Sequence, residues 1–137
     1  MILIDSNILI DVLDDQQEWF EWSSDQLVAL SAEQRTTVNQ IAFAEVAPRL
    51  GGIAAFERRL AEFEIAYEAF GVAAAFAAGS AFLKYRSHRG TARMVLPDFF
   101  IGGHAQVAAA SILTRDPRFY RAYFPTVSLI TPDEAKS

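Results

Sequence analysis

The chain has 137 residues, of which 52% are hydrophobic and eleven are Phe, and it carries a net charge of −5. This composition excludes a disordered chain and predicts a single domain over residues 1–137. There is no cysteine, which excludes disulfides, thiol catalysis and zinc–thiolate sites. The negative charge argues against non-specific binding of duplex nucleic acid, which needs a basic surface.

The first half of the chain alternates apolar runs with helical patterns. In chain order we expect a strand at residues 1–5, helices at 6–13 and 16–29, a strand at 35–39, helices at 40–50 and 53–62, and a short strand at 65–67. Pro48 favours a kink or an early end of the third helix, and Gly51-Gly52 breaks the chain after it. The first residues lack the basic region and long apolar core of a signal peptide, so we expect a cytoplasmic protein.

The second half continues the alternation. We expect a long helix at residues 71–88 with Gly90 as its stop signal, a helix at 97–109, a strand at 111–114, a short helix at 117–123 and a strand at 127–130. The apolar stretch at 70–83 is too short and too rich in Ala and Gly for a membrane span. Strands that alternate with helices predict an α/β fold with a parallel sheet covered on both faces.

Three acidic residues each stand between an apolar, strand-like run and a predicted helix start: Asp5, Asp98 and Asp116. If these runs are neighbouring parallel strands, the carboxylates converge at the carboxyl edge of the sheet, where open α/β folds bind their ligands. Two carboxylates 4 Å apart repel by roughly 4 kcal/mol at an effective dielectric near 20, so the cluster implies protonation or a bound cation. Hard oxygen ligands suit Mg²⁺ or Mn²⁺, whose usual chemistry is on phosphates.

Each acid also has a structural alternative. Asp116, followed by proline, has the sequence of a helix N-cap, and Asp98 places a negative charge at a helix N-terminus. Asp5 or Ser6 could cap the first helix. Glu45 could be a surface residue, although the neighbouring positions of its helix are apolar. The repeated placement at strand ends in one α/β domain favours the functional interpretation.

Four segments resemble the acid-bearing motifs of PIN-domain ribonucleases, in the same order and at similar spacing. They are Ile-Asp-Ser-Asn-Ile-Leu-Ile-Asp (4–11), Asn-Gln-Ile-Ala-Phe-Ala-Glu-Val (39–46), Leu-Pro-Asp-Phe-Phe-Ile-Gly-Gly-His-Ala (96–105) and Ile-Leu-Thr-Arg-Asp-Pro-Arg-Phe-Tyr (112–120). The size of the chain is similar to that of VapC-type toxins of bacterial toxin–antitoxin pairs. The resemblance implies a PIN-like three-layer sandwich, with a central parallel sheet of about five strands covered by helices on both faces.

The resemblance also implies the site. The catalytic acidic quartet is then Asp5, Glu45, Asp98 and Asp116. Of these, Asp5, Asp98 and Asp116 would bind one or two Mg²⁺ or Mn²⁺ ions. Asn7 matches an Asn that supports the first acid through hydrogen bonds, and Thr114 matches a hydroxyl residue that lines the site. The implied activity is that of an endoribonuclease toxin, which hydrolyses RNA through a metal-activated water to give 5′-phosphate and 3′-hydroxyl ends.

The implied partners are an RNA substrate, a cognate antitoxin protein and a second copy of the chain in a homodimer, with no membrane. On a helix Trp19 and Trp22 share a face while Phe20 points elsewhere, so not all three rings can be buried in one core. An exposed ring of this segment is expected to contact the antitoxin. Core packing is the expected use of at least one Trp.

Two alternatives stay open. His104 follows two glycines where many relatives carry alanines, and it is either a buried residue with satisfied polar atoms, which we favour, or a contact to RNA. The alternative to the nuclease is a non-catalytic PIN-like module that binds RNA or protein. In such a module the acids would be eroded, whereas all four are present here.

Overall fold

The computed structural model describes residues 1–13, 18–89 and 96–132. Within these ranges the chain forms five strands, seven α-helices and one 3₁₀ helix. In chain order they are β1 (Ile2–Ile4), α1 (Ser6–Leu13), α2 (Phe20–Glu33), β2 (Thr36–Val38), α3 (Gln40–Glu45), the 3₁₀ helix η1 (Ala47–Leu50), α4 (Ile53–Glu62), β3 (Ala66–Tyr67), α5 (Val72–Arg89), α6 (Leu96–Ala108), β4 (Ser111–Leu113), α7 (Pro117–Tyr123) and β5 (Leu129–Ile130).

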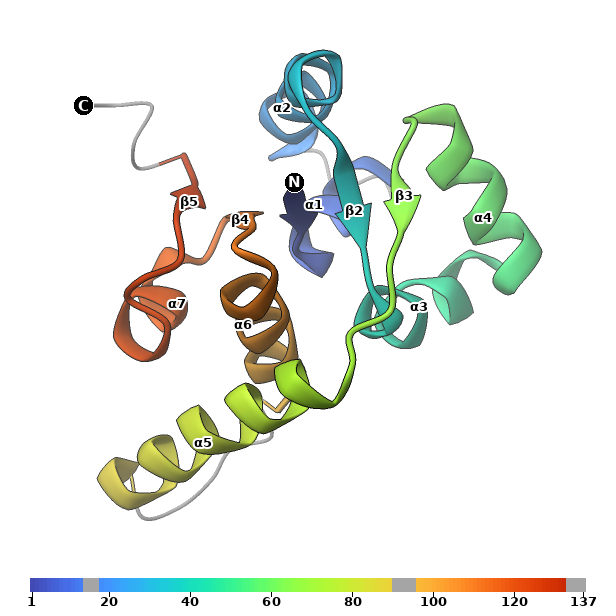
Figure 1. The fold of residues 1–137 in the computed structure, drawn as a ribbon. Helices are drawn as coiled ribbons and strands as arrows, with labels where there is room; N and C mark the ends of the chain where they lie inside the picture. Colours follow the sequence, from blue (N-terminus) through green and yellow to red (C-terminus); the bar gives the residue numbers. More distant parts are fainter. Residues whose placement is uncertain (14–17, 90–95, 133–137) are drawn as a thin grey trace.

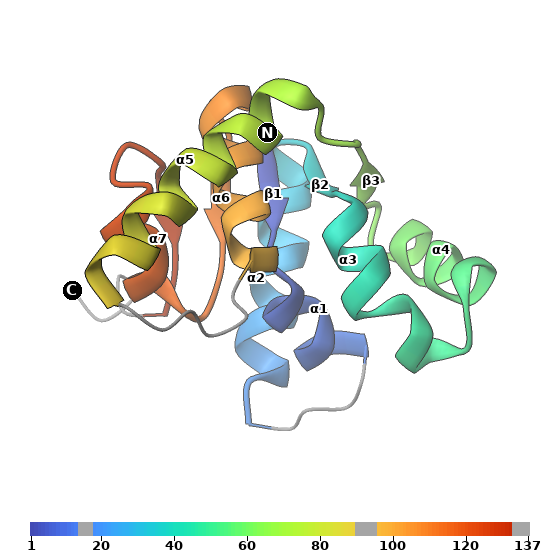
Figure 2. The ribbon, with the colours of Figure 1, turned by 90° about the horizontal axis from the view of Figure 1, so that it is seen from below.

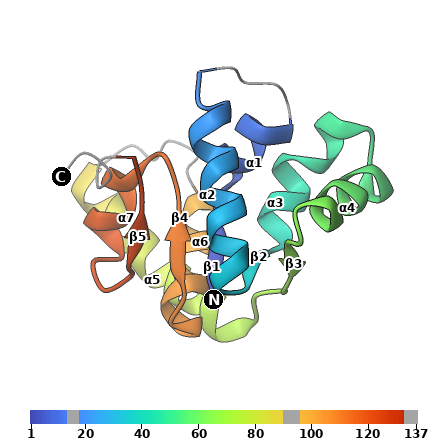
Figure 3. The ribbon, with the colours of Figure 1, turned by 90° about the horizontal axis from the view of Figure 1, so that it is seen from above.

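The five strands form one parallel sheet in the order β3-β2-β1-β4-β5. In the centre, Ile2 pairs with Thr36 of β2 on one side and with Ser111 of β4 on the other. Figure 3 shows β5 with α7 at one end of the sheet and β3 with α4 at the other. Because all strands are parallel, their carboxyl ends meet at one edge, and residues that follow β1 and β4 become neighbours there.

Helices cover both faces of the sheet. In Figure 1, α2 lies above the row of strands and α5 and α6 lie below it. Viewed from below (Figure 2), α5 and α6 lie in front of the sheet, and viewed from above (Figure 3), α2 does. The predicted α/β sandwich with a central parallel sheet of five strands is therefore confirmed.

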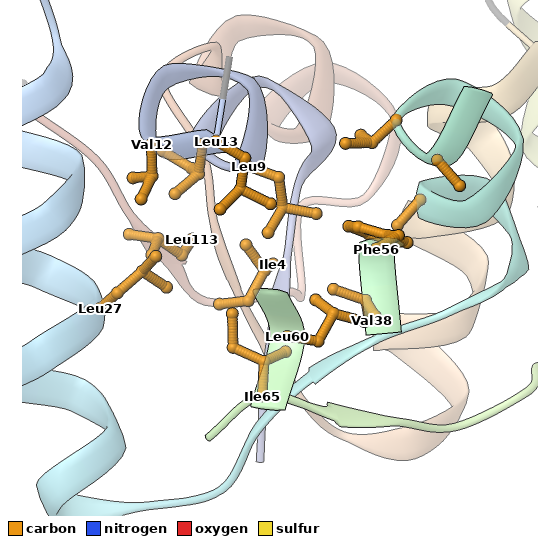
Figure 4. Packing of buried hydrophobic residues seen from close by; sticks show 14 of the residues in the cluster. Ile4, Leu9, Val12, Leu13, Leu27, Val38, Phe56, Leu60, Ile65 and Leu113 are labelled. Atoms are coloured by element: carbon orange, nitrogen blue, oxygen red, sulfur yellow. The ribbon is translucent and has the colours of Figure 1, made fainter. Parts of the chain in front are cut away.

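Alternation along β1 and β4 divides the core into two clusters, because successive side chains of a strand point to opposite faces. Ile2, Ile4 and Leu113 pack with α1, α2, α3 and α4. Figure 4 shows part of this cluster around Ile4 and Phe56. Leu3 and Ile112 face the other way and pack with α5, α6 and α7.

Helices α5 and α6 approach closely at Gly103. A Cβ atom added at Gly103 would lie 2.5 Å from the carbonyl oxygen of Ala74 and 2.8 Å from the backbone nitrogen of Ala78. The absence of a side chain at this position therefore lets the two backbones meet. None of the helices in the described ranges combines the length and the apolarity that crossing a bilayer requires.

Most predicted elements are confirmed within a few residues, and two predictions need correction. The second helix begins at Phe20, not at residue 16, and continues to Glu33; Glu18 and Trp19 lie in a turn, and residues 16 and 17 lie outside the described ranges. The strand-like run before Asp98 is not a strand where it is described, because Leu96 already begins α6. Met94 and Val95 lie outside the described residues, as does the predicted stop at Gly90.

The predicted weakness at Pro48 is confirmed. Helix α3 ends at Glu45, and Pro48 lies in the first turn of η1. Gly51 then ends η1 with a φ of 92°, in the left-handed region that favours glycine.

Candidate active site

A cleft of about 440 Å³ opens at the carboxyl edge of the sheet. Figure 2 shows α1, α3 and the start of α6 around the end of β1. The residues that line the cleft are Asp5, Ser6, Asn7, Ile10, Glu45, Arg49, Asp98, Asp116, Phe119 and Tyr120. All four acids predicted from the sequence therefore face one cavity, although they are separated by up to 111 positions of the chain.

The four acids reach the cleft from different kinds of element. Asp5 directly follows β1, and Asp116 lies in the connection between β4 and α7. Glu45 is the last residue of α3. Asp98 lies in the first turn of α6 and not at the end of a strand, which corrects the placement expected for it. The start of α6 thus brings Asp98 into the cleft, as the end of β1 does for Asp5.

Both carboxylate oxygens of Asp5 accept hydrogen bonds. Oδ1 accepts one from the backbone N–H of Ser6 at 2.7 Å. Oδ2 accepts one from Thr114 Oγ1 at 2.8 Å and one from the hydroxyl of Tyr120 at 3.0 Å. Asp5 is buried, and these three donors fix the orientation of its carboxylate at the floor of the cleft.

Asn7 lines the cleft and Thr114 bonds to Asp5 behind it, and Asn7 reaches Asp5 through Thr114. The side-chain Nδ2 of Asn7 donates to Thr114 Oγ1 at 3.3 Å, and Thr114 donates onward to Asp5. The Oδ1 of Asn7 accepts from the backbone N–H of Arg115 at 3.2 Å. Asn7 therefore ties the start of α1 to the segment that follows β4, the segment that carries Asp116.

Asp116 occupies the N-cap position of α7, as the Asp-Pro sequence suggested, but its side chain makes no capping hydrogen bond. Its backbone N–H donates to Thr114 Oγ1 at 3.0 Å. The structural alternative for Asp116 therefore leaves its carboxylate unexplained, and that carboxylate lines the cleft. Glu45 is held by Ser6, whose hydroxyl donates to its Oε1 at 2.7 Å.

Burial and mutual repulsion raise the pKa of two of the acids. Burial raises the pKa of Asp5 to about 6 against the lowering effect of its hydrogen bonds, with a further contribution from the charge of Glu45. Burial also raises the pKa of Asp98 to about 7, aided by the carboxylates of Asp5, Glu45 and Asp116. Burial and the charge of Asp5 raise the pKa of Tyr120, which therefore stays a neutral donor. The cleft thus concentrates negative charge that only protons or a cation can relieve.

The donor set of the cleft fits a hard divalent cation. It consists of carboxylates with hydroxyl and amide oxygens nearby, the ligand types that Mg²⁺ and Mn²⁺ prefer. Among the described residues, no group of three or more His, Cys, Asp or Glu side chains is arranged so that it could hold a metal ion by itself. Mg²⁺ is commonly bound by one or two carboxylates and several waters, so an open set of acids suits it.

Three parts of the site were not foreseen from the sequence. The buried Tyr120 donates a hydrogen bond to Asp5. The sequence feature that could have indicated this role is the position of Tyr120 one helical turn after Asp116, because a buried Tyr usually pairs its hydroxyl with a polar partner. Ser6 bonds to Glu45. Arg49 of η1 also lines the cleft and adds a positively charged side chain to it.

An ion pair between a buried Asp and a partly exposed Arg was also not foreseen. Asp11 is completely buried and accepts two hydrogen bonds from the guanidinium of Arg115, at 2.6 and 2.9 Å, and one from Ser23 at 2.7 Å. The same guanidinium lies 5.4 Å from the ring centroid of Trp19. Arg115 therefore anchors the segment before Asp116 to α1 and to Trp19 at the start of α2, which is a structural role.

The aromatic segment at the start of α2 is divided as expected. Trp22 packs against the core, and its ring meets the ring of Trp19 edge-on at 6.2 Å. Phe20 points elsewhere and is 43% exposed. His104 is buried and bonded to Asn39 and Glu68, so the buried interpretation of His104 is confirmed.

The family model for the PIN domain matches residues 2–125. The chain belongs to the PIN domain family. No curated protein matches it by sequence. Among solved structures it is similar to VapBC2 from Rickettsia felis bound to a DNA fragment from their promoter, with 16% identity and a TM-score of 0.74 over 96% of this chain and 98% of that one.

Two further structures share the fold. A toxin–antitoxin complex from Klebsiella pneumoniae contains a chain that is 23% identical, with a TM-score of 0.63 and coverage of 96% of this chain and 98% of that one. FitAcB from Neisseria gonorrhoeae is 19% identical, with a TM-score of 0.64 and the same coverage. The PIN fold therefore extends over nearly the whole length of the chain.

Proposed function

We propose that this PIN domain is a metal-dependent endoribonuclease and the toxin of a toxin–antitoxin pair. The observation that carries the proposal is the convergence of Asp5, Glu45, Asp98 and Asp116 on one cleft. Burial and repulsion from the other three acids raise the pKa of Asp98. Folding tolerates such repulsion at a site where an ion is to be bound. The toxin role is supported by the likeness to solved toxin–antitoxin complexes of the same fold.

Asp5, Asp98 and Asp116 are the residues that would hold Mg²⁺ or Mn²⁺ in this cleft. When bound, such an ion activates a water molecule and offsets the charge of a phosphodiester. The hydrogen bonds from Ser6, Thr114 and Tyr120 hold the Asp5 carboxylate in one orientation.

Glu45, which also lines the cleft, presents a further carboxylate that could accept a proton from the attacking water. Arg49, which lines the same cleft, is the residue that would contact a phosphate of the RNA backbone. Attack by external water predicts products with 5′-phosphate and 3′-hydroxyl ends.

The proposal is tested by RNA cleavage with the purified protein. Activity is expected with Mg²⁺ or Mn²⁺, is expected to be lost in EDTA and is expected to return when metal is added back. Ca²⁺ should support RNA binding but only slow cleavage, because its coordination geometry is looser and its metal–oxygen distances are longer. Ends that carry 2′,3′-cyclic phosphate would contradict attack by external water.

Variants locate the activity. Asp5→Ala and Asp98→Ala are expected to abolish cleavage while the protein stays folded, since removal of one like charge relieves repulsion in the metal-free cleft. Glu57→Ala, at an exposed position of α4, is the matched control that removes a carboxylate elsewhere. Full activity of Asp98→Ala with Mg²⁺ would refute the site, and a soluble wild type that binds RNA without cleaving it would support the non-catalytic module.

A further inference from the structure

A buried polar contact joins the two helices that carry Glu45 and Asp98. Asn39, which follows β2 and caps α3, lies with its Nδ2 3.0 Å from Nδ1 of His104, in the middle of α6. Both side chains are almost completely buried. The other ring nitrogen of His104, Nε2, lies 3.4 Å from Oε2 of Glu68. Polar groups are kept in such surroundings only when they are paired, so the contact is a specific one.

The direction of this hydrogen bond follows from the cap. Oδ1 of Asn39 accepts from the backbone N–H of Ile41 at 2.9 Å, which turns the amide NH₂ toward His104. Nδ1 of His104 must therefore accept, and the ring proton sits on Nε2, facing Glu68. One side chain, Asn39, thus starts α3 and binds α6 at the same time.

The contact lies at matching positions of the two helices. Glu45 lies six residues after Asn39, and Asp98 lies six residues before His104. Six residues span about 9 Å of helix in either case. Asn39 meets His104, and Glu45 and Asp98 share the cleft, where the charge of Glu45 acts on Asp98. The helices therefore run in opposite directions, with Asn39 and His104 paired at one end and Glu45 and Asp98 in the cleft at the other.

We propose that His104 is a positioning residue, which sets the separation between the carboxylates of Glu45 and Asp98 through its hydrogen bond with Asn39. The buried contact holds α6 against α3, and its loss would leave a buried polar group unpaired and let the two helices move relative to each other. The meaning of this separation for catalysis rests on the proposed nuclease function. The separation itself does not, and it can be measured without metal or RNA.

Two substitutions at His104 separate its two ring nitrogens. The amide oxygen of Asn stands near the position of Nδ1, so His104→Asn keeps an acceptor for Asn39 and loses the contact to Glu68. The amide of Gln reaches toward the position of Nε2, so His104→Gln keeps the contact to Glu68 and loses the acceptor. Asn39→Ser removes the donor while it retains a good N-cap for α3. Glu68→Ala is the matched control, because it removes only the partner of Nε2.

The separation is read by cross-linking. The chain has no cysteine, so a Glu45→Cys/Asp98→Cys variant carries only the two thiols of interest. We expect a short bifunctional thiol reagent to join them several times more slowly once His104→Gln or Asn39→Ser is added. His104→Asn and Glu68→Ala should leave the rate unchanged. Equal rates in all five proteins would overturn the proposal, as would slowing by Glu68→Ala to the same extent.

Calorimetry with Mg²⁺ alone gives a second measurement on chains that keep their acids. We expect His104→Gln and Asn39→Ser to weaken Mg²⁺ binding about 10-fold and to lower kcat with little change in KM, since residues behind a metal site typically contribute this much. His104→Asn should restore both quantities. Wild-type protein that binds no Mg²⁺ would contradict the nuclease, and the cross-linking result would still decide the role of His104.

Discussion

Asp98 and Asp5 hold their protons more tightly in the folded protein than in the unfolded chain, since burial and neighbouring charges raise their pKa values to about 7 and about 6. Between pH 4 and pH 7 the folded state therefore binds more protons than the unfolded state, and stability falls as the pH rises. We expect the metal-free protein to lose about 2–4 kcal/mol from these two groups between pH 5 and pH 8. Urea unfolding at a series of pH values in EDTA measures this slope.

Asp98→Asn isolates the contribution of one residue. The variant keeps the shape of the side chain and removes its titration, so its stability should fall less steeply over the same pH range. Mg²⁺ should stabilise the wild type more at pH 8 than at pH 5.5, because at the lower pH protons compete for the same oxygens. A wild-type slope no steeper than that of Asp98→Asn would show that Asp98 is not held in a repulsive cluster.

At the residue scale, the sequence predicts the acids that line the cleft but not the hydrogen bonds that orient their carboxylates. Asp5, Glu45, Asp98 and Asp116 were predicted, as were Asn7 and Thr114, and all six lie in or directly behind the cleft. The hydrogen bond from Tyr120 to Asp5 joins residues 115 positions apart. Its existence depends on how α7 packs against β1, which no local pattern specifies.

At the scale of elements, the ion pair of Asp11 and Arg115 joins α1 and α2 to the segment between β4 and α7. Arg115→Ala leaves the buried carboxylate of Asp11 without its cation and should destabilise the fold by about 3–5 kcal/mol. Asp11→Ala should cost less, because the guanidinium of Arg115 is 27% exposed and can be hydrated. Urea unfolding of both variants tests the order.

The double variant Asp11→Leu/Arg115→Met is the control for that prediction. Replacement of both charges by apolar side chains leaves no unpaired buried group, so it should recover much of the loss. If the double variant were as unstable as the sum of the two single variants, the two side chains would not be coupled.

Helices were predicted better than the strand-to-helix junctions. The pattern before Asp98 reads as a strand because its residues are apolar, yet Leu96 and Pro97 form the first turn of α6. Proline is favoured at the start of a helix, so the same residues support both interpretations. An apolar run of four residues cannot decide between a strand and the buried start of a helix, and packing against α5 decides it here.

For the molecule as a whole, the alternation of elements predicts a parallel sheet but not its strand order. The order β3-β2-β1-β4-β5 places the first strand in the middle, with Asp5 at the centre of the carboxyl edge. The crossovers that follow β1 and β3 then carry the chain to opposite sides of β1. The position of the cleft at this edge follows from that arrangement.

The proposed toxin must be restrained in its own cell, and we predict that the start of α2 contributes to the surface that an antitoxin binds. Phe20 is 43% exposed at the start of α2, whereas Trp22 of the same segment packs against the core. We expect expression of the chain alone to arrest growth and co-expression with the neighbouring small gene product to relieve the arrest.

Phe20→Glu should weaken the complex at least about 10-fold and leave RNA cleavage unchanged, because an aromatic anchor typically contributes more than 1.4 kcal/mol to binding. Val107→Glu, at an exposed apolar position on α6, is the matched control that should preserve the complex. Harmless expression of soluble wild-type protein without a partner would count against the toxin and favour the binding module.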